Sequence, residues 1–279
     1  MIGGRDYHFF VMRSIDSEPK GAKVGQREKA ISYTLPLETP PLFLYAEGMK
    51  TIGLIGGMTW HSTWEYYRLI NEDVQRRLGG SSSARLVLYS VEFGEIEALQ
   101  EAGDWERMTF LMTDAARRVE AAGADFIVIC ANTMHRTAEA ITAAVRIPLL
   151  HIADAAAAEI RGRGLKTVGL LGTRYTMEQD FYRRRLEEKH GLAVLVPDEA
   201  ERRTIHDVIY HELGHGLIRD ESRKAYVGII DKLRRRGAEG VILGCTEIPL
   251  LVKPGDTALP LFDTTALHAK AAVDLALFN

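Results

Sequence analysis

Residues 237–249, GAEGVILGCTEIP, and residues 123–135, GADFIVICANTMH, are two versions of one pattern, 114 positions apart. Each begins with Gly-Ala and continues with an acidic residue, a short apolar run and small polar residues. This order is typical of a buried parallel strand that ends in a loop. In this register Cys245 aligns with Ala131, and Gly244 aligns with Cys130. The two cysteines of the chain are therefore not equivalent.

Two further pairs of segments extend the repeat. Residues 50–57, KTIGLIGG, return as residues 166–173, KTVGLLGT, at an offset of 116. Residues 147–150, IPLL, return as residues 259–262, LPLF, at an offset of 112. Three pairs in the same order at nearly one spacing indicate a duplicated α/β unit. We therefore predict an α/β protein of two pseudo-symmetric three-layer domains with mostly parallel sheets, and an active site in the cleft between the domains.

The repeat also sets the predicted domain boundaries. We assign residues 49–148 to the first half and residues 149–262 to the second, and we expect residues 263–279 to form a C-terminal helix that returns to the first half. Residues 1–48 sustain no periodicity and are interrupted by prolines and glycines. We interpret them as a poorly ordered extension, and their charged start lacks the pattern of a signal peptide.

Composition excludes several classes of protein. The chain has 279 residues, with 35 basic against 38 acidic side chains, so its charge gives no case for a nucleic acid partner. No apolar run approaches the roughly 20 residues of a membrane span. Two cysteines cannot make a disulfide framework, and they indicate reduced thiols in a cytoplasmic protein.

Local patterns predict the elements within each half. Strands are expected at residues 51–55, 85–91, 126–130, 148–151, 166–172, 192–196, 240–244 and 259–262. Helices are expected after Gly57, over 104–122, from about 135, near 199–213, over 221–236 and over 265–277. We expect Trp64, Tyr67, Ile70 and Val74 on one face of the first helix, a polar segment around Gln100, and a capping box at Thr176 and Gln179.

Three further features of the sequence do not indicate a site. GLIGGM at residues 53–58 lacks the GxGxxG spacing of a dinucleotide site. HELGH at residues 211–215 matches HExxH, but Gly214 weakens the helix that a zinc site needs, so we predict no metal. His135 and His151 have no evident partner in the sequence, and we interpret both as structural.

Two symmetry-related strand ends that face one cleft suit racemisation. In that reaction a base removes the α-proton and an acid on the opposite face returns it. A cysteine can do this without a cofactor if the cleft stabilises its thiolate. Cys245 lies in a loop after a strand and is our catalytic candidate. Cys130 is expected to face the core, because neighbouring strand residues point to opposite faces.

At these residues the sequence resembles a known family. GLIGGMTWHSTWEYYR, ICANTMH, LLGTRYTMEQDFY and GCTEIPLL are similar to the cofactor-independent aspartate/glutamate racemases, especially the enterobacterial L-aspartate/glutamate racemase branch. The resemblance implies a homodimer without a cofactor that binds a dicarboxylic amino acid and uses one cysteine from each half. It places the second cysteine at Cys245 and substrate contacts at Met58, Gln100, Asn132 and Thr133. Thr246 and Glu247, beside Cys245, are further candidates for substrate binding.

The sequence departs from this family at two positions. Ala131 stands where the first catalytic cysteine is expected, and alanine can neither give nor take a proton. The family often carries a lysine near position 203 for the distal carboxylate, and here Arg202 or Arg203 could provide that charge with a different geometry; Arg203 is our candidate for the contact. Three functions stay open: a slow or one-sided racemase in which water or Thr133 replaces the missing acid, a lyase similar to arylmalonate decarboxylases that uses Cys245 alone, and a binder of small acids.

Overall fold

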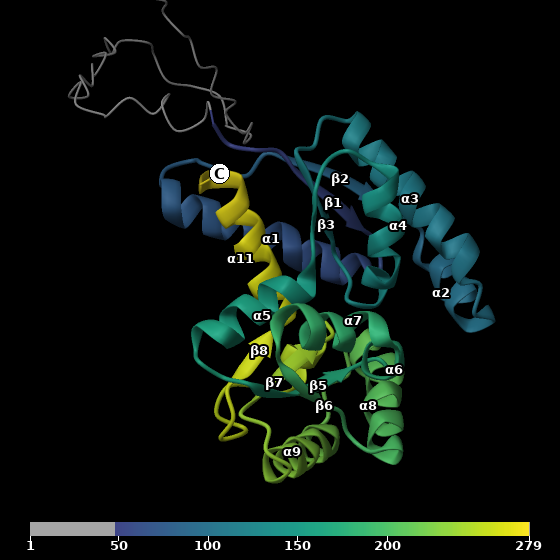
Figure 1. Cartoon of the computed structure of the whole chain (residues 1–279), viewed down its shortest axis with the longest axis vertical. Coiled ribbons are helices and arrows are strands. Elements are labelled where there is room, and N and C mark those ends of the chain that lie inside the picture. The colour runs from purple at the N-terminus through teal and green to yellow at the C-terminus, as the bar shows by residue number, and fades with distance from the viewer. Residues whose placement is uncertain (1–47, 279) are drawn as a thin grey trace, which may run out of the picture. The chain divides into compact units, whose positions relative to one another are not determined.

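The computed structural model describes residues 48–278. The predicted extension, residues 1–48, lies outside this range except for Gly48. The described chain contains two sheets, each of four parallel strands, with helices packed around them (Figure 1). No helix in this range is both long and apolar enough to cross a membrane.

The two sheets have the same topology, as the repeat predicts. The first sheet has the order β2-β1-β3-β4 and the second has the order β6-β5-β7-β8. Every pairing is parallel. The strands are β1 (Ile52–Gly56), β2 (Leu86–Ser90), β3 (Phe126–Ile129), β4 (Leu149–Leu150), β5 (Thr167–Gly172), β6 (Ala193–Leu195), β7 (Gly240–Gly244) and β8 (Leu261–Asp263). The predicted duplicated α/β fold is confirmed.

The acidic residue of the repeated motif accepts hydrogen bonds from the neighbouring strand in both sheets. Asp125 Oδ2 accepts a hydrogen bond of 2.6 Å from the backbone N–H of Thr51, just before β1. Glu239 Oε2 accepts bonds of 2.7 and 2.8 Å from the N–H groups of Lys166 and Thr167, at the start of β5. A carboxylate therefore satisfies the first donors of the neighbouring strand, which fixes the register of the two central strands.

Helices cover both faces of the first sheet. They are α1 (Trp60–Leu78), α2 (Phe93–Ala102), α3 (Trp105–Ala121), η1 (Thr133–Thr137), α4 (Ala138–Ala144) and the last helix, α11 (Thr264–Phe278). Ile52 and Leu54 of β1 pack in one apolar cluster with α1 and with Ala272 and Val273 of α11. Ile55 packs on the other face, against α2, α3 and η1. This alternation follows from the two-residue period of a strand.

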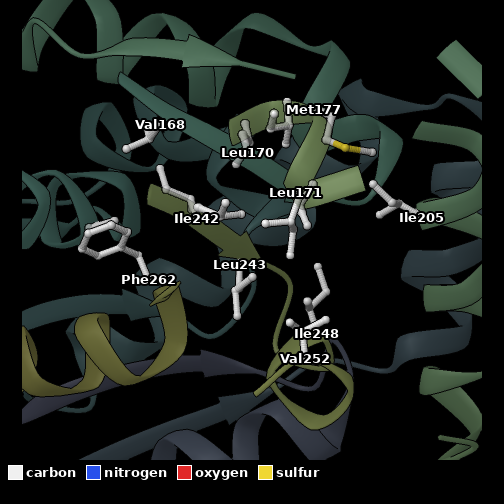
Figure 2. Packing of buried hydrophobic residues seen from close by; sticks show 14 of the residues in the cluster. Val168, Leu170, Leu171, Met177, Ile205, Ile242, Leu243, Ile248, Val252 and Phe262 are labelled. Atoms are coloured by element: carbon white, nitrogen blue, oxygen red, sulfur yellow. The ribbon is translucent and has the colours of Figure 1, made fainter. Parts of the chain in front are cut away.

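The second sheet has one continuous apolar core, part of which Figure 2 shows. Leu170, Ile242 and Phe262 are register partners across β5, β7 and β8, and Leu171 pairs with Leu243 in the next row. The remaining elements of this half are α5 (Ile152–Gly162), α6 (Arg174–Glu178), α7 (Asp180–Arg184), η2 (Arg185–Lys189), α8 (Glu199–His211), η3 (Leu213–His215), α9 (Asp220–Arg235) and α10 (Ile248–Leu251).

The first half differs from the sequence prediction in two places. The segment around Gln100 is the helix α2, and its start is capped by Glu92, whose carboxylate accepts from the N–H groups of Gly94 and Glu95. Of the four residues predicted to share one face of α1, Trp64 and Tyr67 are exposed, whereas Ile70 and Val74 are buried. The buried face of α1 consists of Ser62, Thr63, Tyr66, Ile70 and Val74.

The second half differs at two helix ends. The predicted capping box was wrong, because the N-cap residue of α6 is Thr173, whose hydroxyl accepts from the N–H of Thr176. Helix α8 ends at His211, two residues earlier than predicted, and a short 3₁₀ turn follows it. A Gly at position 214 favours this early end.

Candidate active site

A cavity of about 240 Å³ lies where loops of the two halves meet. Residues 131–134, after β3, line it from the first half, and the last residue of β7, Gly244, lines it from the second half together with residues 245–247. These are the two copies of the repeated motif. Parallel strands end at the same edge of a sheet, so the duplication brings both loops to one cavity.

Cys245 lines this cavity together with Thr246 and Glu247. Its Sγ lies 2.9 Å from Oε2 of Glu247, and Oγ1 of Thr246 lies 2.5 Å from the same oxygen. Burial raises the pKa of the Cys245 thiol, and the negative charge of Glu247 raises it further. The thiol therefore holds its proton at neutral pH and donates it in a hydrogen bond to the carboxylate.

The other cysteine is excluded from the cavity. Cys130 is fully buried in the apolar cluster between β1, α1 and α11. Burial raises the pKa of its thiol. The next residue, Ala131, lines the cavity and has no polar atom in its side chain. Within residues 48–278, Cys245 is thus the only thiol that reaches this cavity.

Asn132 has one polar atom without a partner. Its Nδ2 lies 3.1 Å from Oγ1 of Thr264, and that hydroxyl donates its only hydrogen to the carbonyl of Leu243 at 2.9 Å. Asn132 must therefore donate to Thr264, which fixes the orientation of the amide and leaves Oδ1 free. The residue is buried and lines the cavity. A buried acceptor without a donor is costly, so Oδ1 suits an N–H group of a ligand.

Thr133 joins the two halves through hydroxyl groups. Its Oγ1 lies 3.1 Å from Oγ1 of Thr173 and 3.5 Å from Oγ1 of Thr176, and those two hydroxyls are 3.3 Å apart. All three side chains are buried, and Thr133 and Thr173 line the cavity. A connected set of hydroxyls can pass a proton from one member to the next.

Met58 and Gln100 also line the cavity, as the sequence resemblance implies. The sequence did not point to Glu97 on α2 or to Tyr210 on α8, which lie on the wall as well. Burial raises the pKa of Tyr210, and the nearby Tyr175, Cys245 and Glu97 add to this effect, so the phenol keeps its proton. No local pattern marks either residue as part of a site.

The structure does not bring Arg203 to the cavity. Its side chain is exposed on α8, where Nη2 lies 3.4 Å from Oε1 of Glu199. Arg202 is also engaged elsewhere, with a bond of 2.9 Å to Glu178 and one of 2.8 Å to the carbonyl of Pro197. Neither arginine is among the residues that line the cavity.

The HELGH segment does not present two imidazoles on one helix face. Helix α8 ends at His211, whose Nδ1 donates to the carbonyl of Asp207, and Glu212 is the residue after the helix. His215 lies in the following turn and lines the cavity. Across residues 48–278 no three His, Cys, Asp or Glu side chains gather in a way that could hold a metal ion.

The model of the Asp/Glu/hydantoin racemase family matches residues 55–272 of the chain. The chain belongs to this family. It is therefore an isomerase of the racemase type. A provisionally assigned Asp/Glu racemase from Yersinia pestis is 55% identical, with a TM-score of 0.79 over 82% of this chain and 100% of that one. An aspartate racemase homologue from Pyrococcus horikoshii is 39% identical, with a TM-score of 0.71 over 82% and 99%. The broad-specificity amino-acid racemase RacX of Bacillus subtilis is 24% identical over 231 residues, which are 81% of this chain and 98% of RacX.

In this racemase a buried histidine holds the loop that carries Ala131. The Nδ1–H of His135 donates to the carbonyl of Ala131 at 2.8 Å, and its Nε2 accepts from the N–H of Ile152 at 3.1 Å. Burial lowers the pKa of His135 far below its usual value, and the neighbouring His151 and His268 lower it further. The neutral ring thus acts as a brace between the loop after β3 and the start of α5, which agrees with a structural role.

Two more neutral histidines lie beside it. His151 is 4.5 Å from His135 between ring centroids, and its Nδ1 accepts from the N–H of Ala153. His268 accepts from the hydroxyl of Tyr66 at Nδ1 and donates from Nε2 to the carbonyl of Leu150. Burial lowers the pKa of His151 to about 3 and that of His268 to about 4. Protonation of either ring would abolish an accepted hydrogen bond.

We expect the racemase to lose stability steeply below pH 6.5. Unfolded histidines bind protons near pH 6.5, whereas His135, His151 and His268 stay neutral in the folded state, so the unfolded state binds more protons. Each contributes up to about 1.4 kcal/mol per pH unit, so together they contribute up to roughly 4 kcal/mol per unit near pH 5, which lies between the unfolded pKa and the folded pKa values. Urea unfolding at several pH values measures this slope.

A matched pair of variants tests the cause of that slope. His151→Asn keeps a side-chain oxygen for the N–H of Ala153 and should lower the slope by about a third. His61→Gln removes an exposed histidine and should leave the slope unchanged. A slope that stays the same in His151→Asn would contradict the assignment.

Proposed function

We propose that the chain racemises a free α-amino acid without a cofactor, by proton transfer between Cys245 and the α-carbon. The observation that carries this proposal is the thiol of Cys245, which alone among the thiols of residues 48–278 lines the cavity formed by both copies of the repeat. Membership in the racemase family supports the reaction class. The cysteine mechanism is our inference from the cavity, since a thiolate is a suitable base for an α-proton.

Glu247 is proposed to prepare the thiol for this step. Glu247 Oε2 accepts the hydrogen bond of Cys245, 2.9 Å away, and conducts the thiol proton to solvent, and the resulting thiolate removes the α-proton of the substrate. The bonding electrons of that C–H bond move into a planar enediolate, and the sulfur becomes a thiol again. The thiol then returns a proton to the planar intermediate, which regenerates the thiolate.

The opposite face of the intermediate needs a different proton source. Ala131 presents only a methyl group there, so we propose that Thr133 relays a proton, through its contacts with Thr173 and Thr176 or through water. A hydroxyl is a far weaker acid than a thiol, so inversion should be slow relative to exchange on the Cys245 face. Asn132 Oδ1 is the proposed acceptor for the ammonium group of the substrate.

Aspartate and glutamate remain the substrates that the sequence predicts. The Yersinia pestis relative is described as an Asp/Glu racemase, whereas RacX is described as having broad specificity. A distal carboxylate would need a cation, and Arg203 does not line the cavity. The dicarboxylic substrate therefore stays a prediction. The homodimer and the cytoplasmic location, which the sequence also suggests, are predictions as well.

One observation favours a second function. The methyl group of Ala131 offers no acid on one face of the cavity, while Cys245 can protonate the other. One-sided protonation of an enediolate is what a lyase similar to arylmalonate decarboxylases requires. Release of carbon dioxide from an aryl-substituted malonate would identify that reaction.

The test of the proposed function is exchange of the α-proton in deuterated water. We expect the protein to incorporate deuterium at the α-carbon of one enantiomer of its substrate, and to produce the opposite enantiomer more slowly, because only one face has a thiol. Mass spectrometry measures the deuterium, and chiral chromatography measures the inversion. Absence of exchange with acidic, neutral and basic amino acids would refute the proposal.

A further inference from the structure

The cavity contains negative groups without a matching cation. Glu97 and Glu247 line it, and no lysine or arginine does so among residues 48–278. No ion pair of these residues includes either carboxylate. Within the same range, His215 is the one lining side chain that carries a basic nitrogen. A second carboxylate on the substrate would therefore be repelled.

The two carboxylates have different positions relative to the reacting sulfur. Glu247 accepts from Cys245 and Thr246 through one oxygen, so it belongs to the end of the cavity where the α-carbon must lie. Glu97 comes from α2 in the first half and lies near Tyr210, whose pKa it helps to raise. The substrate side chain extends away from the α-carbon, so Glu97 is the carboxylate available to it.

The nearby arginines are engaged outside the cavity. The guanidinium of Arg136 lies 3.9 Å from the ring centroid of Trp105, and that of Arg174 lies over Tyr175. Neither lines the cavity. A dicarboxylic substrate would thus leave its distal carboxylate without a cationic partner and close to Glu97.

We propose that Glu97 selects amino acids with a positively charged side chain, of the lysine and ornithine type, and discriminates against dicarboxylic amino acids. This inference rests on the proposed racemase function and names the substrate class of the same site. The distal ammonium group would pair with Glu97, while Asn132 Oδ1 and Glu247 remain for the groups at the α-carbon.

The wild-type protein gives the first test. Deuterium exchange is compared at pH 8 for lysine, for its uncharged analogue norleucine, and for glutamate. We expect kcat/KM for lysine to exceed that for glutamate by at least about tenfold, with norleucine between them, because an ion pair in a partly solvated cavity replaces a repulsion. A preference for glutamate over lysine would overturn the inference while leaving the racemase proposal intact.

Substitutions of Glu97 test whether this residue causes the preference for lysine. Glu97→Gln keeps the shape of the side chain, and it should lower the preference for lysine over norleucine by about fivefold or more. Glu97→Arg should shift the preference toward glutamate by about tenfold or more. Glu101→Gln removes an exposed carboxylate from the same helix and is the matched control, with an expected change below about twofold.

Binding measurements show whether the inference about Glu97 holds independently of whether the protein is a racemase. Calorimetry with Cys245→Ala measures the affinity for the same three amino acids without catalysis. Tighter binding of lysine than of glutamate, lost in Cys245→Ala/Glu97→Gln, supports the role of Glu97 even where exchange is absent. Equal or tighter binding of glutamate, or a preference for lysine that Glu97→Gln leaves unchanged, overturns it.

Discussion

Replacing Cys245 by alanine is expected to lower α-proton exchange by about 10²- to 10⁴-fold for every substrate, because a positioned acid/base group contributes that much. Alanine removes the only thiol at the cavity among the described residues and leaves Glu247 with Thr246 as its remaining hydrogen-bond donor. Cys245→Ser should lose nearly as much, since a serine hydroxyl is a far weaker acid than a thiol. Deuterium incorporation, followed by mass spectrometry, measures both losses.

Cys130→Ala is the matched control for this loss. Cys130 is buried in the core between β1, α1 and α11, so its truncation should cost about 1 kcal/mol of stability but change exchange by less than about twofold. Thermal unfolding shows that each variant is folded at the assay temperature. Exchange that survives in Cys245→Ala but disappears in Cys130→Ala would reverse the assignment of the two thiols.

The dependence of the wild-type rate on pH adds a second readout. The raised pKa of Cys245 means that only a small fraction is thiolate at neutral pH. The rate of α-proton removal should therefore rise with pH, by at most tenfold per unit, until the thiol titrates. Cys245→Ala should lack this rise, which distinguishes loss of the base from a general loss of binding.

The sequence predicted the fold and part of the cavity because a duplication leaves a long-range signal. Two copies of one strand and loop had to end at equivalent edges of two sheets. Ala131, Asn132, Cys245 and Thr246 could therefore be assigned together before any contact was known. The same alternation of strand residues indicated that Cys130 faces the core, and the structure buries it there.

Other parts of the cavity could not be predicted, because they depend on how helices pack. Glu97 reaches the wall from α2, a helix whose polar sequence gave no strong pattern. Arg203 was suggested by its place in the chain. The direction of its side chain, however, depends on which face of α8 is buried. Ile205, Val208 and Ile209 form the buried face of that helix, and Arg203, two residues before Ile205, points to solvent.

The free amide oxygen of Asn132 is a further property that local patterns could not reveal. The orientation of the amide depends on Thr264, 132 positions later, and on the carbonyl to which the Thr264 hydroxyl donates. Hydrogen bonds of this kind are set by the final packing of distant segments. The sequence could therefore name Asn132 as a contact but not say whether it donates or accepts.

Introducing a cysteine at position 131 is expected to raise the rate of inversion by about 100-fold, the lower end of what a positioned acid/base group contributes. Ala131 aligns with Cys245 in the repeat and lines the cavity, so Ala131→Cys places a second thiol at the equivalent strand end. In the wild type, the proton that Cys245 removes returns mainly to the same face. With a donor on each face, the ratio of inversion to exchange should approach one.

The contribution of the second thiol is isolated by combining substitutions. Ala131→Ser adds a side chain of similar size without a thiol and should leave inversion within about threefold of the wild type, because a hydroxyl is a poor proton donor. Cys245→Ala/Ala131→Cys carries a thiol on the opposite face alone, so it should exchange the enantiomer that the wild type exchanges slowly, with little inversion. Exchange of the same enantiomer in both single-thiol proteins would mean that positions 131 and 245 do not face the α-carbon from opposite sides, and the two-sided geometry of the cavity would have to be abandoned.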